Sequence, residues 1–185
     1  MPSYRTLNHG LIHVNNNKDL ELDDWANTLM DDCLKKWLEL RYIELKHGGV
    51  LSFNIATSPH LHNLINEAWE KLLSNTNIKH EELAKVNIPV FNRVLGQSEK
   101  VINSISEKFK LVKGEVMENW VQFTRSTFNA LFYNQIISGL SNYPQRFCDL
   151  KSMEQFYTQL ENEFFEESEF ISVYFEFELF LLQKL

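Results

Sequence analysis

The sequence has little glycine and lacks the common motifs for a nucleotide, a metal or a covalent nucleophile. Its 185 residues include six glycines, and none forms the G-x-G pattern that lets a backbone approach phosphates closely. The P-loop, the G-x-S-x-G nucleophile elbow, Cys-x-x-Cys and His-Glu-x-x-His are all missing. We therefore assign no catalytic, cofactor-binding or metal-binding residue, and we expect no cofactor in the isolated chain.

Positive charge and cysteine are also scarce. The net charge is −7, and no run of Lys and Arg could neutralise several phosphates, so we expect no nucleic-acid partner. Cys33 and Cys148 are too few for a disulfide framework, which favours reduced thiols in a cytosolic protein. No apolar run reaches the roughly 18 residues of a membrane span, and the N-terminus does not resemble a signal peptide. We expect a cytoplasmic protein that does not bind membranes.

Two patterns resemble reactive sites, and each has a simpler interpretation. His60 and His62 have a metal-like spacing, but no Cys or carboxylate ligand lies nearby in the sequence, so we expect a surface or capping role. The stretch from Glu161 to Glu169 holds five glutamates beside two phenylalanines. We interpret it as a solvated helix end rather than a pair of catalytic carboxylates.

Hydrophobic periodicity predicts an α/β protein. Apolar residues recur at three- and four-residue steps from Asp23 to Lys46, which predicts a long amphipathic helix, and Gly48-Gly49 provides a left-handed stop. The apolar run Val50–Ala56 follows as a buried strand, and the sequence helix, tight turn, strand is typical of half a parallel α/β unit. Alternating, aromatic and β-branched residues make Phe170–Leu182 the strongest strand signal.

The remaining elements complete a single predicted domain, residues 1–185. Leu11–Val14 is a brief strand or extended arm, and a further strand starts at Phe109 with an irregularity at Gly114. Helices are predicted at Pro59–Ser74, Ser98–Lys108, Thr124–Gly139 and Leu150–Phe165. We expect a small mixed sheet of about three strands, with helices forming most of the domain.

Three stretches, in order, resemble one known family. Asp32–Leu51 reads DCLKKWLELRYIELKHGGVL, Val86–Phe91 reads VNIPVF, and Val121–Phe128 reads VQFTRSTF. They are similar to the "FL-x-x-RA-x-EL-x-x-GG-x-LV" run, the "NIP-x-Y" turn and the "A-x-x-x-R-A" helix of the SABATH carboxyl methyltransferases, which use S-adenosylmethionine. Two positions depart from the pattern, because Tyr42 replaces the alanine of "RA" and Phe91 replaces the tyrosine of "NIP-x-Y".

The resemblance implies a class I, Rossmann-like methyltransferase fold, with a helical cap over a small carboxylic-acid substrate. The cap would correspond to insertions at about residues 59–108 and 124–165. In this family the substrate carboxylate and the methyl sulfonium are held in line, and catalysis is mainly positioning. Carried over to this chain, the resemblance implies five substrate-binding residues: Phe91, Thr124, Thr127, Ser172 and Tyr174.

The resemblance covers only the C-terminal part of the family's fold. The chain starts where the family has already completed four strands and both cofactor motifs, so we expect the chain to be inactive alone. The strand Val50–Ala56 would then expose a long apolar edge that needs protection. Three candidates are Leu11–Val14 folding back, a symmetric dimer, and a separately made N-terminal half.

Three hypotheses for function follow. The chain is a methyltransferase fragment that needs a complementary half, or a non-catalytic binding or interaction module that acts as a dimer or with a partner chain. The third hypothesis is an unrelated α/β protein whose motifs match by accident.

Overall fold

The computed structural model describes residues 10–13, 20–91 and 93–185, and these residues form two compact units. The helical unit contains residues 10–13, 60–90 and 120–173. The sheet unit contains residues 20–59, 91, 93–119 and 174–185. Each unit brings together segments that are far apart in the sequence, and each is described separately below.

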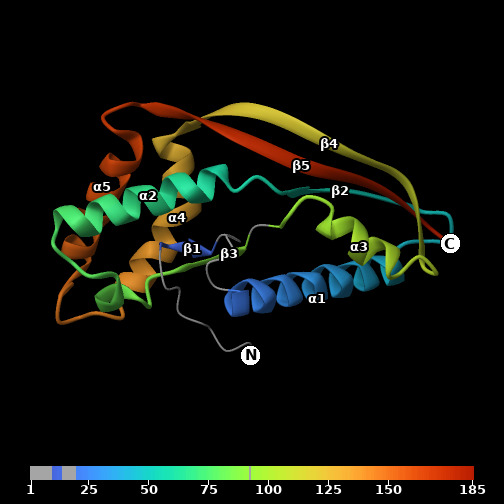
Figure 1. The fold of residues 1–185 in the computed structure, drawn as a ribbon, viewed down its shortest axis with the longest axis horizontal. Coiled ribbons are helices and arrows are strands. Elements are labelled where there is room, and N and C mark those ends of the chain that lie inside the picture. The colour runs from blue at the N-terminus through green and yellow to red at the C-terminus, as the bar shows by residue number, and fades with distance from the viewer. Residues whose placement is uncertain (1–9, 14–19, 92) are drawn as a thin grey trace. The chain divides into compact units, whose positions relative to one another are not determined.

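The sheet unit is built on a three-stranded antiparallel sheet in the order β2-β5-β4. Its strands are β2 (Val50–Ala56), β5 (Phe170–Lys184) and β4 (Phe109–Thr124), of which β4 and β5 also supply residues to the helical unit. Helices α1 (Leu20–Glu44) and α3 (Gln97–Asn103) pack together against one face of this sheet (Figure 1).

The core of the sheet unit follows from the alternation of side chains along β5. Phe180 and Leu182 are buried and lie opposite Phe53 and Leu51 of β2, so all four point to the same face. Leu38 of α1 and Ile102 of α3 pack against them. Full burial of a side chain of this size stabilises the folded state by roughly 1.5–3 kcal/mol, which applies to Phe180, Leu182, Leu38 and Ile102.

The turn between α1 and β2 depends on glycine. Gly48 has a φ of +73°, in the left-handed region, and its N–H donates to the Lys184 carbonyl at 3.1 Å. A Cβ on Gly49 would lie 2.8 Å from the Lys46 carbonyl oxygen, which is too close for any other residue. The predicted glycine stop is therefore confirmed, and it delivers the chain directly into β2.

The helical unit contains three helices, a 3-10 turn and a small sheet. The helices are α2 (His60–Asn75), α4 (Arg125–Leu140) and α5 (Leu150–Phe165), and α5 packs against both of the others (Figure 1). The 3-10 turn is η1 (His80–Leu83), and the small sheet pairs β1 (Ile12–His13) with β3 (Ile88–Phe91). The Phe128 ring is fully buried, and its centroid lies 4.7–5.9 Å from the rings of Phe132, Tyr157, Phe164 and Phe165.

One asparagine holds β1 in place. Asn66 of α2 accepts through Oδ1 from the N–H groups of Leu11 (2.8 Å) and Ile12 (3.0 Å), and its Nδ2 donates to the Ile12 carbonyl (2.9 Å). The Ile88 N–H donates to the Leu11 carbonyl at 2.8 Å. The first of the three candidate protections for the edge of Val50–Ala56 is therefore wrong for Leu11–His13, because this segment pairs with β3. Val14 lies outside the described residues.

The structure corrects four other expectations from the sequence. The sheet is antiparallel rather than mixed, because the neighbour of β2 is the distant β5. The "NIP-x-Y"-like stretch is strand β3 rather than a turn, and β4 extends to Thr124, so Val121–Thr124 is strand rather than part of a helix. Helix α3 ends at Asn103 rather than Lys108.

None of the described helices is long and apolar enough to cross a membrane.

The aromatic core of the helical unit predicts the effect of one truncation. Phe128→Ala should lower the free energy of unfolding by about 3–5 kcal/mol, because it leaves a cavity among four other rings. Urea unfolding followed by circular dichroism measures the change. The control Leu131→Ala, on the same helix but 47% exposed, should change it by less than about 0.5 kcal/mol. Equal losses in the two variants would contradict this placement of α4.

Candidate functional site

Thr124 and Thr127, two of the predicted substrate residues, form the start of α4. Thr124 is the N-cap, and its Oγ1 accepts from the Thr127 N–H at 3.2 Å. The two hydroxyls lie 3.1 Å apart, and both residues are exposed. This geometry gives them a capping role, and their contact with a substrate stays a prediction.

The other three predicted residues lie on two strands. Phe91 is the last residue of β3, and its side chain lies outside the described part of the chain. Tyr174 belongs to the sheet unit, where burial and a hydrogen bond to Glu118 raise the pKa of its phenol. Ser172 belongs to the helical unit and lines a cavity there. The cavity makes Ser172 the starting point for a candidate site.

The cavity has a volume of about 290 Å³ and lies within the helical unit. Its wall is formed by α2, the C-terminal end of α5 and the first residues of β5. Ala68, Phe164 and Phe165 are buried and line it, together with the half-buried Leu64 and Ile171. A concave site lined by both apolar and polar side chains is a candidate site for a small molecule.

Charged residues also line the cavity. Lys71 of α2 forms a hydrogen-bonded ion pair with Glu166, which raises the pKa of the lysine and lowers the pKa of the glutamate. Glu163 accepts a hydrogen bond from Asn75 Nδ2 at 2.7 Å, and Glu67 lies on the same wall. Glu67 and Glu163 also raise the pKa of Lys71, so the negative charge of both carboxylates is felt at the Lys71 ammonium.

One local pattern in the sequence indicates this site. Glu163 and Glu166 lie in the acidic stretch from Glu161 to Glu169, for which a solvated helix end is predicted, and that stretch also contains Phe164 and Phe165. Two adjacent phenylalanines at the end of an acidic helix indicate that one side of it is covered. Lys71 had no such signal, because its partner Glu166 is 95 residues away in the sequence.

The two spaced histidines lie on α2 in different surroundings. The His60 ring packs edge-on against Trp120, with 5.6 Å between the ring centroids. Burial lowers the pKa of His62 to about 4, so this side chain is neutral at pH 7. Among residues 10–13, 20–91 and 93–185, no group of three or more His, Cys, Asp or Glu side chains could hold a metal ion.

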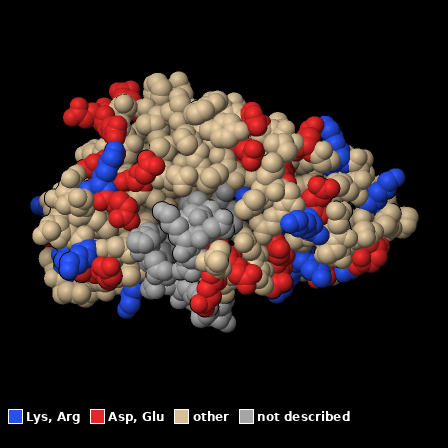
Figure 2. Space-filling view, in the orientation of Figure 1, with Lys and Arg blue, Asp and Glu red and all other residues tan. Residues whose placement is uncertain are grey.

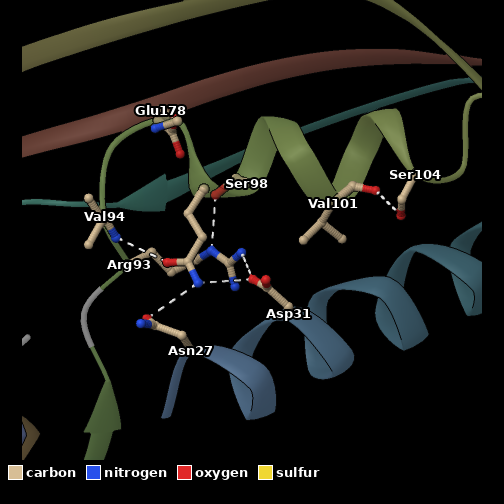
Figure 3. Close-up of polar contacts among 10 residues, drawn as sticks. Asn27, Asp31, Arg93, Val94, Ser98, Val101, Ser104 and Glu178 are labelled. Carbon is tan, nitrogen blue, oxygen red and sulfur yellow. Dashed lines mark hydrogen bonds and ion pairs between the residues drawn. The ribbon is translucent and has the colours of Figure 1, made fainter. Parts of the chain in front are cut away.

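A buried arginine organises the polar interior of the sheet unit (Figure 3). The Arg93 side chain is 6% exposed, and its Nη2 lies 2.5 Å from Asp31 Oδ1 of α1. Its Nε donates to the buried Ser98 Oγ at 3.1 Å, and Gln97 Nε2 donates to Asp31 Oδ1 at 3.0 Å. Arg93 therefore ties the start of α3 to α1.

Glu178 of β5 holds the same loop from another side (Figure 3). It is 5% exposed, and its Oε1 accepts from the Gly96 N–H at 2.7 Å. Its Oε2 is buried and has no hydrogen-bond partner among the described residues. The sequence indicated only that Glu178 alternates with apolar residues in a strand, because its partner Gly96 is 82 residues away.

Three of the glycines, Gly48, Gly96 and Gly139, do not form a phosphate cradle. A phosphate cradle needs backbone N–H groups that point at the ligand, usually from glycine-rich turns. Gly48 and Gly96 have left-handed backbones in turns, but their N–H groups are bonded to Lys184 and Glu178. Gly139 packs against Val86, where an added Cβ would lie 3.0 Å away. These three glycines are therefore used in folding the chain.

The surface carries mixed charge. Figure 2 shows basic side chains singly or in small groups beside acidic ones, without a continuous basic patch on the face in view. The expectation that nucleic acid is not a partner stays a prediction for the molecule as a whole.

The comparisons with known proteins support a methyltransferase-like fold. No protein-family model and no curated protein sequence matches the chain. Among solved structures, a "Loganic acid methyltransferase with SAH" is similar, with a TM-score of 0.55 at 16% identity. The match covers 97% of this chain and 54% of that one, so this chain spans about half the length of the methyltransferase. At this identity the similarity concerns the fold alone.

The low pKa of His62 predicts a loss of stability in acid. The folded chain keeps His62 neutral down to about pH 4, whereas an unfolded histidine takes up its proton near pH 6.5. The unfolded state therefore binds more protons between these values, and the free energy of unfolding should fall by up to about 3 kcal/mol as the pH drops through this range. His62→Gln should remove that part of the pH dependence, measured by urea unfolding. The exposed control His47→Gln should keep it.

The Arg93 network predicts different effects for two neighbouring aspartates of α1. Asp31→Ala removes a carboxylate that pairs with the buried guanidinium and should cost about 2–3 kcal/mol. This is less than for a fully buried pair, because the Asp31 side chain is 41% exposed. Asp32→Ala, one residue along and exposed, should cost less than about 0.5 kcal/mol. Thermal or urea unfolding of both variants measures the difference, and similar values would count against the network.

Proposed function

We propose that the chain is the C-terminal, substrate-covering part of a SABATH-type, S-adenosylmethionine-dependent small-molecule methyltransferase, and that it acts with a complementary cofactor-binding half. The observation that carries this proposal is the fold similarity over 97% of this chain but only 54% of the loganic acid methyltransferase. The three ordered motif stretches support the family. In this proposal the cofactor would be held by the other half of a class I fold.

The two edges of the three-stranded sheet differ in a way that supports a partner at β2. Strand β4 carries Lys110, Lys113, Glu115 and Glu118, and charged side chains are a common protection against edge-to-edge pairing. Strand β2 reads VLSFNIA and has no charged residue. Among the described residues β2 pairs only with β5, so its other side is open.

The hydrogen-bond pattern identifies which groups of β2 are available to a partner. The Thr57 N–H donates to the Glu176 carbonyl at 2.9 Å, and the Gly49 carbonyl accepts from the Lys184 N–H at 2.9 Å. Because bonding alternates along an antiparallel pair, Leu51, Phe53 and Ile55 also face β5. The backbone groups of Ser52 and Asn54 therefore point to the open edge.

The sheet face opposite the core also supports a covering layer. On this face Ser52, Asn54 and Ala56 lie opposite Leu181, Leu179 and Phe177, which are only half-buried. Val112 and Val116 of β4 are 51% and 49% exposed. An antiparallel sheet can leave one face to water, but exposed apolar residues gathered on such a face mark an interaction surface.

In this proposal the chain contributes binding and positioning rather than acid–base chemistry. Burial keeps His62 neutral at pH 7, and Glu178 accepts a hydrogen bond from the Gly96 N–H. Neither side chain is therefore assigned a proton-transfer step. The helical unit would close over the substrate, and the complementary half would present the methyl donor. Two exposed, unpaired cysteines, Cys33 and Cys148, support the cytoplasm as the location.

The second candidate is a non-catalytic binding module that acts as a dimer or with a partner chain. The cavity favours it, because its lining lies within the helical unit and needs no complementary half. A symmetric dimer would pair two β2 edges through the same Ser52 and Asn54 backbone groups.

The proposal predicts that cofactor binding depends on the edge of β2. Isothermal titration of the chain alone with S-adenosylmethionine should give no binding, whereas the complex purified from native cells through a tag on this chain should bind. Asn54→Pro removes an edge-facing N–H without disturbing the bonds to β5, so it should abolish assembly and retain the fold. Asn54→Val keeps the N–H and should assemble normally.

Two outcomes would contradict the first candidate: binding of S-adenosylmethionine by the chain alone, or an Asn54→Pro chain that still assembles. A homodimer in light scattering that Asn54→Pro dissociates, and that does not bind the cofactor, would support the second candidate instead.

A further inference from the structure

The cavity of the helical unit has a size that suits a one-ring ligand. Its volume of about 290 Å³ is at the lower end of the roughly 300–1,000 Å³ of ligand pockets in proteins. Phe165 is fully buried and Phe164 is 6% exposed, so the apolar side of the cavity rests on a rigid aromatic core. Such a surface favours a flat or compact apolar body over a flexible chain.

The charges of the cavity determine which polar group such a ligand should carry. Three carboxylates line it, those of Glu67, Glu163 and Glu166, against the single ammonium of Lys71. Lys71 and Glu166 neutralise each other in their ion pair. Glu67 and Glu163 then give the wall an excess of two negative charges. Both carboxylates raise the pKa of Lys71, so their negative potential acts at the cavity.

We propose that this cavity binds a small organic cation: a primary amine on a compact, one-ring apolar body. The apolar part would lie against Leu64, Ala68 and Phe164, and the ammonium would lie toward Glu67 and Glu163. This differs from the carboxylic acid that the family resemblance implies, because a carboxylate would meet like charge at this wall. The inference concerns the helical unit alone and does not depend on methyltransferase activity.

The experiment compares two probes of nearly equal shape and opposite charge, phenethylamine and 3-phenylpropionate, by isothermal titration against the full chain at neutral pH. The amine should bind about tenfold more tightly than the acid, and raising the salt concentration should reduce the difference. Equal affinities, tighter binding of the acid, or no binding of either probe would overturn the proposal.

Charge variants test whether the cavity itself gives this preference. Glu67→Gln and Glu163→Gln should each weaken amine binding about two- to fivefold, the usual range for a partly solvated ion pair. Lys71→Met should strengthen it, because it frees Glu166 and removes the competing cation. The control Glu107→Gln removes the same charge from an exposed position of the sheet unit and should have no effect.

A size variant separates binding in the cavity from binding elsewhere on an acidic protein. Ser172 lines the cavity and is exposed, so Ser172→Trp should fill the cavity, abolish amine binding and leave the melting temperature almost unchanged. Retained binding in Ser172→Trp, or an equal effect of Glu107→Gln and Glu67→Gln, would show that the amine binds non-specifically and would overturn the proposal.

Discussion

Strand β5 is the segment on which the packing of both units depends. It lies between β2 and β4 in the sheet, and its Phe180 and Leu182 belong to the core against α1 and α3. Nearer its start, Ile171 and Ser172 line the cavity of the helical unit. Its buried Glu178 holds the loop before α3 through Gly96. One strand near the C-terminus therefore supports the sheet, the loop and the candidate site.

Among the described residues, one side of β2 is unpaired, and the proposed partner would bind there. An antiparallel pair satisfies the backbone of only one side of an edge strand, and β2 has neither charge nor proline to discourage pairing on the other. The protective segment expected from the sequence is bound to Asn66 and β3 instead. The ligand proposed for the cavity does not depend on this edge. The cavity's carboxylates favour a ligand of opposite charge whether or not a partner completes the sheet.

Much of the secondary structure could be predicted because its signals are local. The bounds of β2 and α5 agree with the predicted ranges, and Gly48 adopts the left-handed conformation that its place after a helix suggested. The candidate site was harder to predict from the sequence. Thr124 and Thr127 form a helix cap that any Thr-x-x-Thr at a helix start can form, and their contact with a substrate stays a prediction. The family resemblance indicated positions, but it could not separate capping from binding.

The sequence by itself determined the α/β class, the helix and strand periods, and the absence of a glycine-rich cradle, because these depend on residues that are neighbours along the chain. Only the tertiary structure decided that β2 pairs with β5, that Arg93 is neutralised by Asp31, and that Lys71 meets Glu166. These contacts join residues at least 62 positions apart. Their formation depends on how helices and strands pack, and no local pattern records which distant side chains that packing brings together.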